Sequence, residues 1–140
     1  MRSRMVKEKC RKPVPYGFKI SKDVIAVKDS DTIKRAARVL TGKNIGAVIV
    51  KSDGVMTGIL SERDIVQRVV DKGLDPAAIL VKEIMTRNVI TVDIAEGLNK
   101  IHDELKRIHF RHLPVVKKGR VIGIVSNRDL MYLRKLKLRS

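Results

Sequence analysis

The feature that most constrains this chain is a seven-residue phrase that occurs twice. GILSERD occupies residues 58–64, and GIVSNRD occupies residues 123–129, which is 65 positions later. The same offset aligns residues 16–75 with residues 81–140 without a gap. The aligned identities in the first copy are Val24, Ile25, Val27, Leu40, Val50, Gly54, Gly58, Ile59, Ser61, Arg63, Asp64 and Lys72. This self-similarity indicates a duplicated structural unit.

Both copies predict the same order of elements. Short β-branched runs, VIAV at 24–27 and VITV at 89–92, are typical of buried strands. In the first copy we expect Ser30 to cap a helix that stops at Gly42. The second copy repeats this helical pattern of apolar residues over 98–108.

A predicted hairpin and a second helix complete each copy. Turns that carry Asp53-Gly54 or Lys118-Gly119 separate two further strands, and Asp-Gly between strands is a strong hairpin signal. The last helix is expected to begin at Ser61 or Ser126 and, in the first copy, to end near Gly73. The sequence therefore predicts an α+β fold in which two pseudo-symmetric β-α-β-β-α repeats pack sheet to sheet into one module.

Domain boundaries follow from this register. We expect a basic arm at 1–15, a first repeat at 16–75, a connection at 76–83 and a second repeat at 84–140. A unit of about 60 residues is marginally stable by itself, so two units should share one body. Pairing of equivalent segments would then create two related clefts.

The formal net charge of +16 favours phosphate-bearing partners. Basic residues crowd both ends of the chain, which makes nonspecific nucleic-acid binding an alternative function, although basic tails can also serve solubility alone. Aromatic content is only 3% without Trp, which argues against a stacking platform. The single cysteine, Cys10, fits a reducing compartment. Without an apolar run of about 20 residues we expect no membrane partner and a cytoplasmic location.

The repeated phrase has two interpretations. Ser-x-x-Asp before an apolar run is a capping box, in which Ser61 or Ser126 accepts from a backbone N–H and the carboxylate reaches back. Alternatively, Gly58 within a strand suggests that something approaches the backbone closely. A serine at a helix start can contact phosphate, and an aspartate can accept two hydrogen bonds from a ribose diol. Both interpretations remain open at this point.

Other chemistry finds little support in the sequence. His102, His109 and His112 lack an accompanying Asp, Glu or Cys ligand set, so we expect no metal site. No nucleophile or base lies near Asp64 or Asp129 in the sequence, so we expect no catalytic residues and no enzymatic activity.

With these motifs the chain resembles a tandem pair of cystathionine-β-synthase (CBS) domains. The resemblance rests on the repeated β-α-β-β-α order, both Gly-x-x-Ser-x-x-Asp phrases, and EIMTRNVITV with RHLPVV in the second copy, and it covers about residues 16–140. It implies a stand-alone regulatory module for energy sensing that needs no cofactor. Its clefts would bind AMP, ADP, ATP or S-adenosylmethionine, and it would pass ligand state to an unknown regulated protein.

The resemblance also implies site residues. Asp64 and Asp129 would hold ribose hydroxyls, and Ser61 and Ser126 would contact ribose or phosphate. The other implied positions are Ile25 and Ile90 beside adenine, the segments Gly46, Ala47, Val48 and Arg111, His112, Leu113, and Arg63 and Arg128, which could reach phosphate or simply face solvent.

The two copies differ at the second of these segments. Arg111-His112 stands where the first copy has Gly46-Ala47, so the two clefts should not be equivalent. The resemblance further implies a homodimer. A dimerising scaffold with degenerate clefts is a third alternative.

Overall fold

The computed structural model describes residues 24–96, 103 and 111–126. The chain divides into two compact units. One unit is Ile25–Val89, and the other combines Ile90–Ser140 with the chain up to Val24. Each unit contains one three-stranded sheet.

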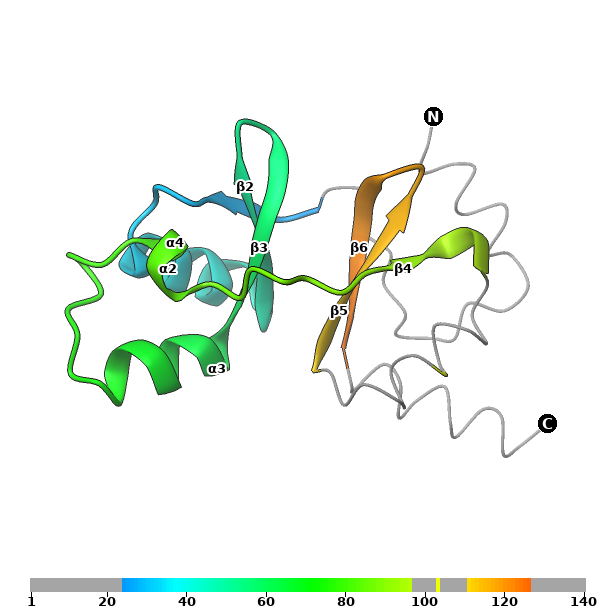
Figure 1. Ribbon diagram of the computed structural model, residues 1–140. Helices are drawn as coiled ribbons and strands as arrows, with labels where there is room; N and C mark the ends of the chain where they lie inside the picture. Colours follow the sequence, from blue (N-terminus) through cyan, green and yellow to red (C-terminus); the bar gives the residue numbers. More distant parts are fainter. Residues whose placement is uncertain (1–23, 97–102, 104–110, 127–140) are drawn as a thin grey trace. The chain divides into compact units, whose positions relative to one another are not determined.

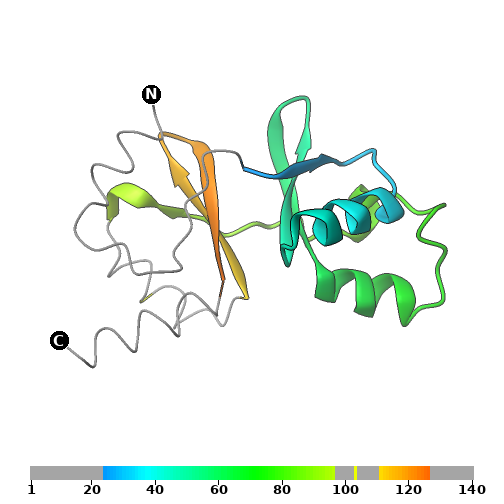
Figure 2. The same cartoon turned by 180° about the vertical axis from the view of Figure 1, so that it is seen from behind.

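The first unit follows the predicted β-α-β-β-α order. Its sheet has the order β1-β2-β3, with β1 parallel to β2 and β2 antiparallel to β3. Helices α2, α3 and α4 lie on the same side of this sheet (Figures 1 and 2). The elements are β1 (Ala26–Lys28), α2 (Ile33–Lys43), β2 (Ala47–Ser52), β3 (Val55–Ser61), α3 (Glu62–Ile65), the π-helical η1 (Val66–Val70) and α4 (Val81–Ile84).

The second unit repeats this sheet. Its elements are β4 (Val92–Asp93), the 3₁₀ helix η2 (Ile94–Glu96), β5 (His112–Lys117) and β6 (Arg120–Ser126). Strand order and pairing directions match those of the first sheet. Even the register shift at Val50/Lys51 recurs 65 positions later, at Val115/Val116. The predicted α+β fold with two repeats is confirmed.

Parts of the prediction lie outside the described residues. The helix expected at 98–108 is described only at Asp103, which is helical. The helix expected after Ser126 and the basic arm at 1–15 fall wholly outside. Sheet-to-sheet packing of the two repeats stays a prediction.

Both hairpin turns form as expected. Asp53 and Gly54 have φ values of 49° and 78°, and Lys118 and Gly119 have φ values of 48° and 76°. Two successive residues with positive φ define a type I′ turn, whose twist matches that of the flanking strands. Turn chemistry therefore fixes the register of both hairpins.

The ends predicted for the first helix are wrong by two residues each. Thr32, not Ser30, is the N-cap, and its hydroxyl accepts from the N–H of Arg35 at 3.2 Å. The helix runs past Gly42 to Lys43 and ends at Asn44, which adopts a left-handed φ of 52°. Asparagine tolerates this conformation, so it takes the terminating role that glycine was expected to have.

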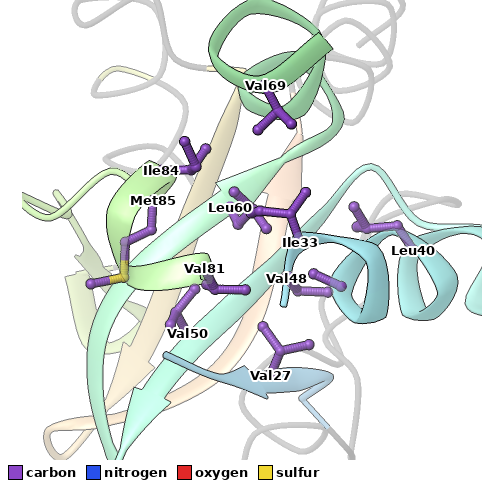
Figure 3. Packing of buried hydrophobic residues seen from close by; sticks show 11 residues of the cluster. Val27, Ile33, Leu40, Val48, Val50, Leu60, Val69, Val81, Ile84 and Met85 are labelled. Carbon is purple, nitrogen blue, oxygen red and sulfur yellow. The ribbon is translucent and has the colours of Figure 1, made fainter. Parts of the chain in front are cut away.

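The core of the first unit draws on every layer. Ile33 of α2, Val48 of β2, Leu60 of β3, Val69 of η1 and Val81 of α4 are fully buried (Figure 3). The sequence analysis did not expect α4, whose first residues fall in the stretch interpreted as a connection, 76–83. This stretch therefore supplies core residues to the unit that precedes it.

Gly58 shows why the chain after α4 lies against the sheet. A Cβ placed on Gly58 would stand 2.6 Å from Sδ of Met85 and 2.8 Å from the carbonyl oxygen of Thr86. Beside this contact, Ile59 and Thr86 exchange two backbone hydrogen bonds of 3.0 and 2.9 Å. The sequence analysis expected a close approach to this glycine, and what approaches it is the chain itself.

We expect Gly58→Ala to lower the free energy of unfolding by about 1–3 kcal/mol, because the added methyl group overpacks against Met85 and backbone. Gly42→Ala is the matched control, since Gly42 lies in α2 with open space around its Cα. That substitution should stabilise the protein by about 0.5–1 kcal/mol. Urea denaturation of both variants measures the difference, and equal stability of the two would contradict the close packing at Gly58.

Candidate ligand-binding site

The repeated phrase of the first unit forms a complete capping box. The hydroxyl of Ser61 accepts from the N–H of Asp64 at 3.2 Å, and Oδ2 of Asp64 accepts from the N–H of Ser61 at 3.0 Å. Both orphan donors of the first turn are thereby satisfied. The capping interpretation is confirmed for this copy.

Arg68 adds a contact that the sequence analysis missed. Its Nε lies 3.8 Å from Oδ1 of Asp64, and one of its terminal nitrogens donates to the carbonyl of Ile84 at 2.7 Å. The signal was present as an Asp–Arg pair at i, i+4. Arg68 thus connects the phrase to α4, and it occupies one side of the Asp64 carboxylate.

Other predicted residues of this copy gather around the cap. Ala47 lies directly opposite Ser61 in the sheet, and the carbonyl of Gly46 accepts from the N–H of Glu62 at 2.9 Å. Ile25 stands beside the start of β2, because its carbonyl accepts from Ile49 at 3.2 Å. One end of the sheet therefore brings together a hydroxyl, a carboxylate, backbone polar groups and an apolar side chain.

Two of the predicted residues have side chains in the sheet interior. Val48 and Leu113 are both fully buried. Val48 packs in the core of the first unit with Leu60 and Ile33. Their backbones can support a site, while their side chains hold the sheet.

The second unit presents a different set of groups at the equivalent end. His112 lies directly opposite Ser126, in the register of Ala47 and Ser61. Arg111, just before β5, is exposed. Ile90 is 44% exposed. Arg128 and Asp129 lie outside the described residues.

Arg63 is an exposed residue of the first turn. With the Gln67 amide oriented so that its oxygen faces the guanidinium, that oxygen accepts from Nε of Arg63 at 2.8 Å. Arg63 thus lies along its own helix. Its place beside Asp64 leaves it free to contact an anion only by a change of side-chain conformation.

Metal and membrane chemistry find no support in the part of the chain that is described. Over residues 24–96, 103 and 111–126, no three His, Cys, Asp or Glu side chains converge as a metal site. His102 and His109 fall outside these ranges. In the same ranges no helix has the length and apolarity needed to cross a membrane.

Taken together, two tandem sheets of identical topology and the repeated Gly-x-x-Ser-x-x-Asp phrase define a regulatory, ligand-binding type of module. The CBS domain profile matches residues 18–71 and 81–135. The chain belongs to the CBS domain family and carries two CBS domains in tandem. Proteins built of such domains alone are generally regulatory rather than catalytic.

Known proteins agree with this assignment. An uncharacterized protein of Methanocaldococcus jannaschii is 31% identical over 115 residues, which are 81% of this chain and 40% of that protein. The chain thus spans less than half of that relative. The solved structure of a CBS-domain containing protein from Agrobacterium tumefaciens is 35% identical, with a TM-score of 0.72 over 81% of this chain and 91% of that one. A hexameric CBS-CP12 protein from bloom-forming cyanobacteria is 26% identical, with a TM-score of 0.70 over 79% of this chain and 65% of that one.

We expect Ser61→Ala to lower the free energy of unfolding by about 1 kcal/mol, because the N–H of Asp64 loses its acceptor. Ser61→Thr is the control, since it keeps a hydroxyl at the cap. Chemical denaturation of the three proteins tests this expectation. A Ser61→Ala variant as stable as Ser61→Thr would show that the capping bond contributes nothing.

Proposed function

We propose that this chain binds adenine nucleotides, namely AMP, ADP, ATP or S-adenosylmethionine, in clefts formed by its two CBS repeats. Ligand state would pass to a separate regulated protein. The observation that carries the proposal is the gathering of Ser61, Asp64, Gly46 and Ile25 at one end of the first sheet. A hydroxyl suits phosphate or ribose, a carboxylate suits a ribose diol, and an apolar side chain suits the face of adenine.

The capping role of Asp64 is compatible with ribose binding. An ionised carboxylate offers about four lone-pair positions over its two oxygens. The cap uses one position on Oδ2, and Arg68 approaches Oδ1 at 3.8 Å. The remaining positions can accept hydroxyl donors, so one side chain can cap the helix and hold a ligand.

The two sites should differ in strength. At i+4 from the phrase aspartate the first copy has Arg68, whereas the second has Leu133. Asp129 therefore has no arginine at that position to compete with a ribose. The residue opposite the phrase serine is Ala47 in the first copy and His112 in the second. We assign the stronger, phosphate-rich site to the second copy, with Arg111 and His112 as its anion contacts.

Calorimetric titration with AMP, ADP, ATP, GTP and S-adenosylmethionine tests the proposal. Asp129→Ala should weaken the tighter adenine-nucleotide site by roughly ten- to a hundredfold, because losing hydrogen bonds to a charged group costs about 1.5–3 kcal/mol. Asp64→Ala is the matched variant and should mainly lower stability through loss of the cap. Arg111→Ala should weaken ATP more than AMP.

Deletion of residues 1–12 is the control for the nucleic-acid alternative. It removes six basic side chains of the arm but neither repeated phrase. Nucleotide affinity should survive the deletion and should respond weakly to salt, whereas binding to nucleic acid through a diffuse field should fall steeply as salt rises. Absence of any nucleotide binding, with salt-tolerant binding of DNA or RNA by the intact chain, would contradict the proposal.

The helix that follows the first phrase also supports self-association. Val66, Val70 and Leu74 recur every four residues and are 57%, 64% and 42% exposed. Glu62 and Arg63 precede this apolar face, and Asp71 and Lys72 follow it. In an antiparallel pair of such helices, each acidic residue would meet a basic one of the second copy. We therefore include a homodimer through this face in the proposal.

Sedimentation analysis of Val66→Asp/Val70→Asp should show at least about a hundredfold weaker self-association, because each copy would bury two carboxylates in an apolar contact. Val55→Asp is the control, since Val55 is 65% exposed at the start of β3, away from this helix. A double variant that associates like the Val55→Asp protein would place the dimer contact elsewhere.

A further inference from the structure

The two units of the chain divide at equivalent positions. The boundary falls between Val24 and Ile25 and again between Val89 and Ile90, 65 residues later. In both places the residue just before the first strand of a repeat belongs to the unit built by the other repeat. The chain before each first strand is therefore the candidate partner of the other sheet.

The first unit shows what such a segment does. Met85 fills the space above Gly58, and Thr86 pairs with the backbone of Ile59 at the edge of β3. Met85 is 5% exposed and belongs to the core cluster. The segment thus closes a sheet edge and completes the core at the same time.

The second sheet has the same requirement. β6 has the burial pattern of β3, position by position, and Gly123 is as buried as Gly58. A strand glycine at an open edge would expose its backbone, so burial of Gly123 means that other chain covers it. Over the described residues of the second unit, β6 pairs only with β5.

The repeat register identifies the covering chain. Subtracting 65 from Met85 and Thr86 gives Ile20 and Ser21. The CBS domain profile begins at residue 18, which places this segment inside the domain rather than in the arm. We propose that residues 18–22 dock on the edge of β6, with Ile20 above Gly123 and Ser21 paired to Ile124.

This docking surface has a consequence for the basic arm. Residues 1–15 are joined to the segment that closes the second sheet, not the first. A partner that holds the arm would pull on the strand that ends in Ser126, which is part of the proposed stronger site. The arm and that site would then be mechanically connected, while the first unit would be closed by its own later chain.

Engineered disulfides test the register. In a Cys10→Ser background, Ser21→Cys/Ile124→Cys should form an intrachain bond on mild oxidation, because facing residues in an antiparallel pair have Cα atoms about 5.5 Å apart. Ile59→Cys/Thr86→Cys is the positive control from the first unit. Lys22→Cys/Ile124→Cys is the negative control, since neighbouring strand residues point to opposite faces.

Mass spectrometry of the monomeric species counts the linked peptides. We expect a yield for Ser21→Cys/Ile124→Cys near that of the positive control and several-fold above that of the Lys22→Cys pair. A yield equal to that of the Lys22→Cys pair would overturn the proposal. This outcome is independent of nucleotide binding.

Thermal unfolding of Gly123→Ala provides a second measurement without new cysteines. If Ile20 covers Gly123, the substitution should lower the Tm by about 5 °C or more, as at Gly58. Alanine is otherwise favoured over glycine within a strand, so an open edge would give an unchanged or raised Tm. An unchanged or raised Tm would therefore count against the docked segment.

Discussion

Packing of the chain after α4 against Gly58 is the contact on which the first unit depends. It aligns Thr86 with Ile59, buries Met85, and keeps Val81 and Ile84 over the sheet. Arg68 reaches across to the carbonyl of Ile84, so the helix that carries the phrase is held by the same segment. Closure of the core and orientation of the phrase thus have one cause. A repeat of about 60 residues lacks the apolar surface to achieve both alone.

The two interpretations of the repeated phrase prove to be complementary. A capping box fixes the rotamers of Ser61 and Asp64 through two short hydrogen bonds, at 3.2 and 3.0 Å. Side chains held in this way lose little conformational entropy when a ligand arrives, which favours binding. The ion pair with Arg68 is longer, at 3.8 Å, and its guanidinium is about half exposed. Such a contact can yield to a ribose hydroxyl more readily than the cap can.

Most of the fold could be predicted from the sequence because its determinants are local. Type I′ turns need residues that accept positive φ, and Asp53-Gly54 supplies them. The alternation of the strands and the cap at Ser61 likewise involve residues close together in the chain. The N-cap at Thr32 was missed because Ser30 is an equally good capping residue. Local preference cannot choose between them, whereas the hydrogen bond from Leu80 to β-bridge partner Thr32 belongs to tertiary structure.

For the site, sequence reasoning found the groups but not their arrangement. Gly58 correctly indicated a close approach, yet a glycine does not reveal whether a ligand or the chain itself approaches. Only long-range packing shows that Met85, 27 positions later in the numbering, is the neighbour. Arg68 was visible as an i, i+4 partner of Asp64, but its second bond to α4 was not.

Divergence between the copies follows from these constraints. The backbone positions that set the fold, such as the bulges at Val50/Lys51 and Val115/Val116, coincide in both sheets. Residues facing the phrase serine do not coincide, since Ala47 and His112 differ in size and charge capacity. A side chain at the open end of a sheet can change without disturbing the ladder beneath it. Duplication therefore preserves two frames while allowing their sites to take on different affinities, which a sensor of nucleotides with different phosphate numbers requires.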